Sequence, residues 1–191
     1  PNACVFCNQR VITGVMAAAD RDIRPEIDAA LASILLPPTD VQIAFFGGSF
    51  TGIDRTLMLR LLDDAYAYVR AGKVDSIRLS TRPDYISAEI LDILKSYGTK
   101  SVELGIQSMD DTVLALSMRG HTAADSERAC KLVKAYGFEL VGQMMLGLPG
   151  STEESDVLPL ARMATFLYDS PSITTAQALY SSFSQDSITL S

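Results

Sequence analysis

Two cysteines near the start of the chain are the residues best suited to chemistry. Cys4 and Cys7 form a C-x-x-C pair within PNACVFCNQRVITG, so both thiolates can reach one metal ion or cluster. Two thiolates leave such a centre short of ligands. Cys130 lies in a helix-like segment on or near an apolar face, and His121 is the only histidine of the chain. The pair alone leaves open a zinc half-site, a redox pair or chance.

Four apolar, strand-like runs end in glycine or polar residues. Glycine lets the backbone approach a ligand closely. Each stretch also has a purely structural interpretation. In the order of the stretches listed below, these interpretations are a tight turn, a proline-ended strand with solvated Arg82 and Asp84, a strand end with Glu103 at a solvated rim, and a core strand ended by Gly-Leu-Pro. The stretches are FFGGSFTG (45–52), LSTRPDY (79–85), VELGIQSM (102–109) and MMLGLPG (144–150).

Glu103 lies in a strand that is otherwise apolar. A charged group that faces a core is rare unless it is paired. Alternation along the strand places Glu103, Gly105 and Gln107 on one side, so this side is predicted to be polar. Further on, SMRGHT (117–122) brings Arg119 and His121 to the start of a helix. The structural interpretation of His121 is a residue at a capped helix entry.

Strand-like and helix-like segments alternate along the chain. A parallel sheet follows, because each helical crossover returns the chain in the same direction. A barrel and an open doubly wound sheet both satisfy this pattern. Helix caps are predicted at Ser87, at Thr122 with Asp125, and at Ser151 with Glu154. Strands are predicted at 41–46, 76–80, 101–106 and 138–146, helices at 25–36 and 57–69, and 173–180 is a poor strand candidate.

Composition limits the partners and the compartment. The net charge of −7 argues against a polyanion as the main partner of this segment, although RNA stays open for a larger parent protein. Three cysteines, two of them in C-x-x-C, do not form a secreted disulfide framework, and we expect a reducing cytoplasm. We expect no membrane partner, because no apolar run approaches the roughly 20 residues that a spanning helix needs.

The motifs together resemble those of radical S-adenosylmethionine (SAM) enzymes. The similarity covers residues 1 to about 155 and is closest to the Elongator-catalytic-subunit-like and oxygen-independent coproporphyrinogen-oxidase-like branch. A cysteine directly before Pro1 would complete the cluster motif C-x-x-x-C-x-x-C. The fold that this implies is an α/β, parallel-stranded partial TIM-type barrel whose first strand precedes Pro1 and whose last strand is doubtful.

The resemblance implies a 4Fe-4S cluster and SAM as cofactors. Three thiolates, Cys4 and Cys7 among them, would hold the cluster and leave one iron open for the amino and carboxylate groups of SAM. An electron from the reduced cluster cleaves SAM into methionine and a 5′-deoxyadenosyl radical, which takes hydrogen from a substrate. An electron donor is then required, and tRNA is one substrate to consider. Cys4 and Cys7 by themselves supply fewer thiolates than a full cluster needs.

The resemblance also assigns residues to SAM. Gly47, Gly48 and Ser49 match a Gly-Gly motif for the amino group, with Phe50 and Thr51 in the same mouth. Ser80 and Thr81 are candidates for SAM hydroxyls, although a Glu occupies the place of Ser80 in the coproporphyrinogen-oxidase-like pattern. Gln107 with Ser108 would meet the ribose, Arg119 the carboxylate and Met145 the adenine. The predicted cofactor residues are Phe6, Asn8, Gly47, Gly48, Ser49, Ser80, Gln107, Arg119 and Met145.

The expected domain organisation is a truncated radical SAM core over residues 1–168 and a Ser-rich, atypical tail over residues 169–191. Two other hypotheses compete with an enzyme core. One is a non-catalytic iron–sulfur or zinc module that shares Cys4 and Cys7 across a dimer. The other is an inactive truncated product without a cluster. Metal binding without SAM binding would favour the module.

Overall fold

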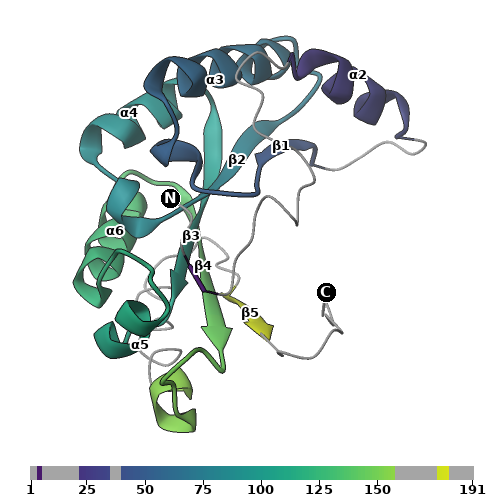
Figure 1. Ribbon diagram of the computed structural model, residues 1–191. Coiled ribbons are helices and arrows are strands. Elements are labelled where there is room, and N and C mark those ends of the chain that lie inside the picture. Colours follow the sequence, from purple (N-terminus) through teal and green to yellow (C-terminus); the bar gives the residue numbers. More distant parts are fainter. Residues whose placement is uncertain (1–3, 6–21, 35–39, 158–175, 181–191) are drawn as a thin grey trace.

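Five parallel strands form one sheet in the computed structural model, which describes residues 4–5, 22–34, 40–157 and 176–180 (Figure 1). Neighbouring strands pair in the order β1-β2-β3-β4-β5, and every pair is parallel. A doubly wound sheet reverses its strand order at a switch point. This sheet does not, so the predicted partial barrel is confirmed. The strands are β1 Gln42–Phe45, β2 Ser76–Thr81, β3 Thr99–Gln107, β4 Glu139–Leu146 and β5 Ala176–Tyr180.

Helices α3, α4 and α6 cover the outer face of the sheet, as Figure 1 shows. The opposite face, called the open face below, is covered by no helix among the described residues. One-way winding explains this, because right-handed crossovers all return over the same face. The helices are α2 Arg24–Ala32, α3 Arg55–Arg70, α4 Ala88–Ser96, α5 Asp111–Leu116 and α6 Ala123–Ala135, with short 3-10 turns η1 Phe50–Gly52 and η2 Pro83–Tyr85. Residues 153–157 are also helical.

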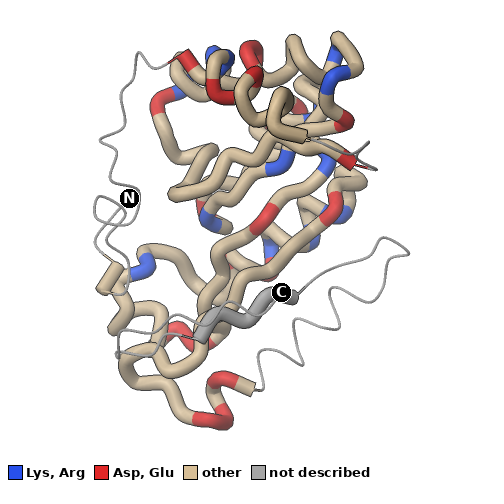
Figure 2. The backbone as a smooth tube through the Cα atoms, turned by 90° about the vertical axis from the view of Figure 1, so that its right-hand side faces the viewer, with Lys and Arg blue, Asp and Glu red and all other residues tan. Residues whose placement is uncertain are grey.

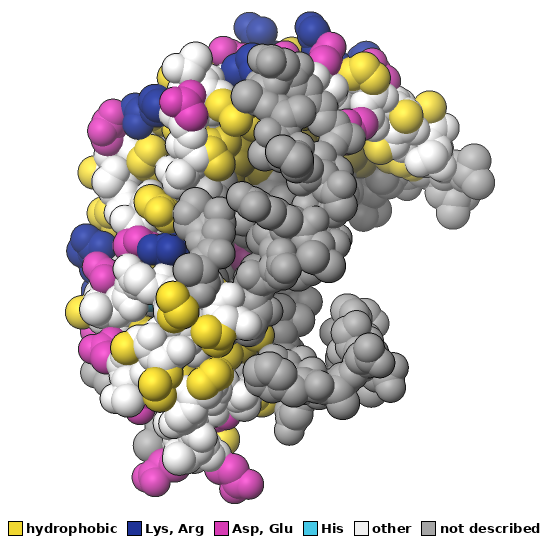
Figure 3. Space-filling view, in the orientation of Figure 1, with side chains coloured by type: hydrophobic (Ala, Val, Ile, Leu, Met, Phe, Trp, Pro, Cys, Tyr) yellow, Lys and Arg dark blue, Asp and Glu magenta, His cyan; other side chains and the backbone are white. Residues whose placement is uncertain are grey.

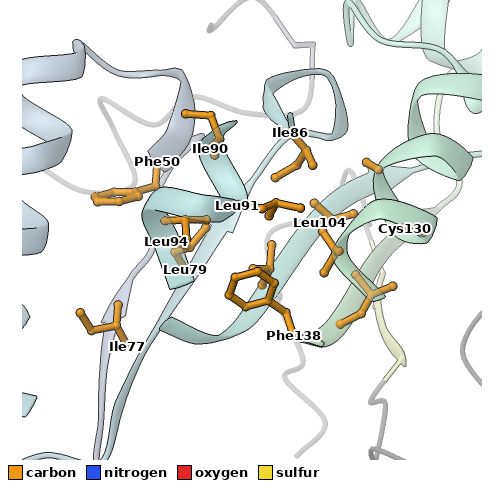
Figure 4. Packing of buried hydrophobic residues seen from close by; sticks show 14 of the residues in the cluster. Phe50, Ile77, Leu79, Ile86, Ile90, Leu91, Leu94, Leu104, Cys130 and Phe138 are labelled. Atoms are coloured by element: carbon orange, nitrogen blue, oxygen red, sulfur yellow. The ribbon is translucent and has the colours of Figure 1, made fainter. Parts of the chain in front are cut away.

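The core lies between the sheet and the helices (Figure 4). Leu79 of β2 and Leu104 of β3 point toward Leu91 and Leu94 of α4, while Cys130 comes from α6. Their neighbours along each strand point to the open face, because side chains alternate across a sheet. The sequence prediction of Cys130 on an apolar helix face is confirmed, since its side chain is fully buried.

Two of the three predicted caps are confirmed. The Ser87 side chain accepts a hydrogen bond from the Ile90 backbone N–H, and Thr122 and Asp125 form a reciprocal capping box. The prediction of Ser151 with Glu154 was wrong by one residue. There, Thr152 and Ser155 exchange backbone-to-side-chain bonds of 2.8 and 3.1 Å. Ser151 donates instead to Asp156, which removes it from the capping position.

β5 lies within the segment that was a poor strand candidate. Its backbone pairs with β4 from Gly142↔Ala176 to Leu146↔Tyr180. A partner edge supplies ladder hydrogen bonds that the local pattern does not reveal, which is why strand formation depends on context. The predicted domain boundary between residues 168 and 169 lies outside the described residues. Within the described ranges, no helix is long and apolar enough to cross a bilayer.

We predict that Leu91→Ala lowers the free energy of unfolding by about 2–5 kcal/mol, because it leaves a cavity beneath α4. Leu91 is fully buried in the core cluster. Leu116→Ala is the matched control, since that side chain is 52 % exposed, and we expect a change of about 0.5 kcal/mol. Urea denaturation of both variants measures the difference. Equal losses would contradict the assignment of the core.

Candidate functional site

The predicted cofactor residues gather at the carboxyl ends of the strands, the edge where parallel barrels carry their sites. Gly47, Gly48 and Ser49 follow β1, and Gln107 ends β3. Arg119 comes from the connection between α5 and α6. Met145 lies near the end of β4 and is half-buried, whereas its neighbour Met144 belongs to the core cluster. Alternation therefore turns Met145 toward the open face.

Arg119 and Gln107 meet above Gly105. The Arg119 guanidinium is buried, and its Nη2 donates to the Gly105 carbonyl over 2.5 Å. A Cβ placed on Gly105 would lie 3.2 Å from Arg119 Nη2 and 3.2 Å from Gln107 Nε2. A larger residue at position 105 would force both side chains to shift by a few tenths of an ångström. The structure thus brings together two residues that the sequence had assigned to one ligand.

Gln107 adopts a left-handed backbone with φ 71°, next to an irregularity in the pairing of β3 with β4. For a residue with a side chain this conformation costs roughly 1–3 kcal/mol and is found preferentially at functional sites. The Gln107 side chain is buried, and its Oε1 accepts no hydrogen bond from the described part of the chain. A ligand hydroxyl would satisfy this acceptor.

Cys4 lies against the connection that carries Arg119. Arg119 Nη1 donates to Cys4 Sγ over 3.5 Å, and Cys4 Sγ lies 3.7 Å from the Met118 carbonyl oxygen. The Val5 backbone N–H donates to Ser117 over 3.4 Å. Residues 115 positions apart in sequence are therefore joined at this edge. Of the other predicted N-terminal ligands, Phe6, Cys7 and Asn8 lie outside the described residues.

The described residues contain no group of three or more His, Cys, Asp or Glu that could hold a metal ion. Cys130 does not join Cys4, because it is buried on α6 among apolar side chains, and burial raises the pKa of its thiol to about 12. Such a thiol is inert. Cys4 is consequently the one described cysteine placed at the strand-end site.

Gly47 and Gly48 form an exposed turn after β1. Gly47 has a φ of 96°, and a Cβ on Gly48 would meet nothing within 4 Å, so a ligand can approach the backbone here. The chain then turns inward through η1. Phe50 stacks on Phe45 with ring centroids 4.4 Å apart.

The structure places Phe50 and Thr51 in the core instead of the predicted mouth. The buried Thr51 hydroxyl forms a 2.6 Å hydrogen bond with the Thr81 hydroxyl. Thr81, which was a candidate for binding SAM hydroxyls, is therefore bonded inside the protein. The 3-10 turn is the physical reason, because it directs these side chains toward the helix layer.

Ser80 lies on the open face and bonds to Glu103. Ser80 Oγ donates to Glu103 Oε1 over 3.0 Å. Gln143 Nε2 donates to the same oxygen, and Arg78 Nη2 donates to Oε2 over 3.3 Å. The interpretation of Glu103 as a solvated rim residue was wrong, since Glu103 is buried. Paired donors compensate for that burial. Figure 2, turned toward the open side, shows acidic and basic residues along the strands.

The structural interpretation of LSTRPDY with a solvated Arg82 and Asp84 is contradicted, because both side chains are largely buried. Arg82 Nε and Nη2 donate to Asp84 over 2.9 and 2.5 Å, and the guanidinium lies over the Tyr85 ring. A Cβ on Gly120 would lie 3.1 Å from Arg82 Nη2. The pair therefore packs against the loop that carries Arg119. In the sequence, the feature that could have indicated this contact is Gly120, because a glycine leaves room for the neighbouring Arg82 side chain.

His121 is more than a residue at a helix entry. Its ring is buried, and Nε2 lies 3.1 Å from the Ile106 carbonyl oxygen. Burial, reinforced by the positive charge of Arg119, lowers the pKa of His121 to about 4. The imidazole is therefore neutral at pH 7, and its Nε2–H donates to Ile106 directly before the left-handed Gln107.

We predict that His121 makes the fold sensitive to acid. The pKa falls from 6.5 in the unfolded chain to about 4 in the folded protein. Between pH 6.5 and pH 4, the His121 imidazole binds a proton in the unfolded chain but not in the folded protein. Stability is retained above pH 6.5 and falls as the pH drops to 4, by about 3 kcal/mol at most. His121→Gln should flatten the pH dependence of the unfolding free energy over this range. Parallel curves for both proteins would refute the assignment.

Several named proteins are similar to this chain in sequence. It is 33% identical over 144 residues to the tRNA uridine(34) acetyltransferase of Dehalococcoides mccartyi (strain CBDB1), which covers 66% of this chain and 31% of that protein. It is 30% identical over 134 residues to Elongator complex protein 3 of Homo sapiens, covering 61% and 24%. The chain thus spans about a third or less of the length of these relatives.

Solved structures share the fold. The Methanocaldococcus infernus Elp3 with an N-terminal deletion superposes with a TM-score of 0.57 at 28% identity, over 69% of this chain and 35% of that one. Coproporphyrinogen III oxidase from Escherichia coli gives a TM-score of 0.63 at 20% identity, over 92% and 41%. The second likeness concerns the fold alone. A sequence profile of the radical SAM superfamily matches residues 1–161, and with the strand-end site described above the chain belongs to the radical SAM superfamily.

Proposed function

We propose that this chain is the core of a radical SAM enzyme, with SAM lying across the carboxyl ends of the strands. The observation that carries the proposal is the convergence of Cys4, Arg119 and Gln107 at one edge. They come from three separate segments of the chain, and Arg119 contacts both Cys4 and the β3 backbone.

The donor set of this edge fits the cofactors of the family. Cys4, with Cys7 and a further thiolate, would hold a 4Fe-4S cluster. The unsatisfied Gln107 Oε1 suits a ribose hydroxyl, and the open backbone at Gly48 suits a polar group of SAM. When bound, the cluster supplies the electron that cleaves SAM to give the 5′-deoxyadenosyl radical. The protein residues bind and orient SAM and exclude water.

A uridine of tRNA is the substrate class that we propose to test first. Its support is the sequence similarity to proteins named tRNA uridine(34) acetyltransferase. Charge gives a constraint, because the chain carries a net charge of −7. On the face shown in Figure 3, acidic and basic side chains are interspersed among the described residues. Recognition by this chain must therefore depend on local contacts more than on a broad basic surface.

Anaerobic reconstitution with iron and sulfide, followed by a SAM cleavage assay, tests the proposed function. We expect Cys4→Ser to reduce bound iron and 5′-deoxyadenosine formation with a reductant, because the cluster loses a thiolate. Cys130→Ser is the matched control, since that thiol lies buried on α6, and bound iron per folded chain should stay the same. If the two variants lose iron equally, Cys4 holds no cluster.

Arg119→Ala should weaken SAM binding by about tenfold or more, because charge-assisted hydrogen bonds contribute roughly 1.5–3 kcal/mol each. Arg119→Lys keeps the charge but loses the planar fork, and its affinity should fall between the two. Arg128→Ala is the control, because that arginine is exposed on α6 and pairs with Asp125. Calorimetry with the cluster-loaded protein measures the affinities. Unchanged SAM affinity in Arg119→Ala would remove Arg119 from the site.

A further inference from the structure

A second, unassigned pair of side chains lies on the open face beside the Gly-Gly turn. Phe46 directly follows β1, and its ring is 55% exposed. The Arg78 guanidinium carbon lies 5.3 Å from the centroid of that ring. Phe45 points the other way and stacks on Phe50 in the outer layer. Alternation along the strand therefore presents Phe46 to the open face.

Arg78 is held in place from below. Its Nη2 donates to the buried Glu103 over 3.3 Å, and Ser80 and Gln143 bond to the same carboxylate. The Arg78 side chain is 33% exposed. Its Nε is buried and has no acceptor within the described part of the chain. The pair thus combines a flat apolar surface with a partly exposed guanidinium that is held by a buried carboxylate.

We propose that Phe46 and Arg78 form a subsite for a uracil-type base of an RNA substrate. Unpaired bases are recognised by stacking on aromatic rings and by hydrogen bonds to their edges. A uracil supplies both requirements, since it is planar and carries two carbonyl acceptors. The cation–π contact keeps the Phe46 ring in place before a base arrives. This inference rests on the proposed function, because the subsite adjoins the Gly47–Gly48 turn assigned to SAM.

A single exposed phenylalanine is common on protein surfaces and needs no function by itself. Two features separate Phe46 from that case. The ring rests on an arginine whose carboxylate partner is buried in the sheet, so the contact is built on a rigid element. It also follows the end of β1, at the same carboxyl edge of the sheet as Gln107 at the end of β3. The occupant to which this geometry points is a base, because a phosphate would leave the ring unused.

The experiment compares short RNAs bound to the anaerobically reconstituted protein at fixed salt, by fluorescence anisotropy. One RNA of about ten nucleotides has a central uridine. The second has an abasic residue there, and the third has 2,4-difluorotoluene, which keeps the shape and lacks the carbonyl acceptors. The wild-type protein should bind the uridine RNA about tenfold more tightly than the abasic one.

Phe46→Ala should bind the uridine and abasic RNAs equally, and Phe46→Tyr should preserve the discrimination. Arg78→Lys, which keeps the charge beside Glu103, should lose the preference for uridine over difluorotoluene. Val157→Ala is the control, because it removes another exposed apolar side chain without affecting any of these ratios. A wild-type protein that binds no RNA, or does not distinguish uridine from the abasic residue, would overturn the proposal.

SAM calorimetry on the same variants separates this inference from the proposed function. Phe46→Ala should leave SAM affinity within about twofold of the wild type. If the wild-type protein binds SAM but shows no base discrimination, the subsite is wrong and the proposed function stands. If Phe46→Ala weakens SAM binding and leaves the RNA ratios unchanged, the ring belongs to the cofactor site. Absence of SAM binding in the wild-type protein contradicts the proposed function itself.

Discussion

Arg119 carries a positive charge into a region that is largely closed to water, and the Gly105 carbonyl accepts a hydrogen bond from it at 2.5 Å. A guanidinium cannot lose its proton to lower the cost of burial, so acceptors must be provided in fixed positions. The carbonyl at the end of β3 provides one, and the same guanidinium reaches Cys4 Sγ. The loop between α5 and α6, the strand end and the cysteine segment are thereby joined.

That interaction constrains its surroundings. Glycine at position 105 leaves room for the Arg119 and Gln107 side chains, which a Cβ there would push away by a few tenths of an ångström. Gln107 takes up a left-handed backbone beside the pairing irregularity, and His121 donates to the preceding carbonyl. Burial keeps His121 neutral, and the positive charge of Arg119 reinforces this by lowering the pKa of the imidazole further. Arg119 and His121, both in the loop between α5 and α6, bond to the two carbonyl groups at positions 105 and 106, just before the left-handed Gln107.

The order of the strands decides what the two faces of the sheet can do. All five strands run parallel and in sequence order, so their carboxyl ends meet at one edge and their helices fall on one side. The outer face then accommodates the apolar core. The open face accommodates the network around Glu103, where a buried carboxylate is stabilised by donors from β2 and β4. Because side chains alternate along each strand, apolar side chains pack on the outer face and polar side chains lie on the open face.

The sequence by itself determined strands β1 to β4, most helices and two caps, because hydrophobic period and capping chemistry are local properties. The resemblance of its motifs to those of radical SAM enzymes also singled out Arg119 and Gln107. Only the tertiary structure decided that β5 forms, that Glu103 is paired and that Thr51 and Thr81 bond within the core. Each of these depends on a partner 20 or more residues away. The local sequence pattern carries no information about such a distant partner. Yet the partner's strand edge, side-chain donor or hydroxyl group decides whether the strand forms or the polar side chain is paired.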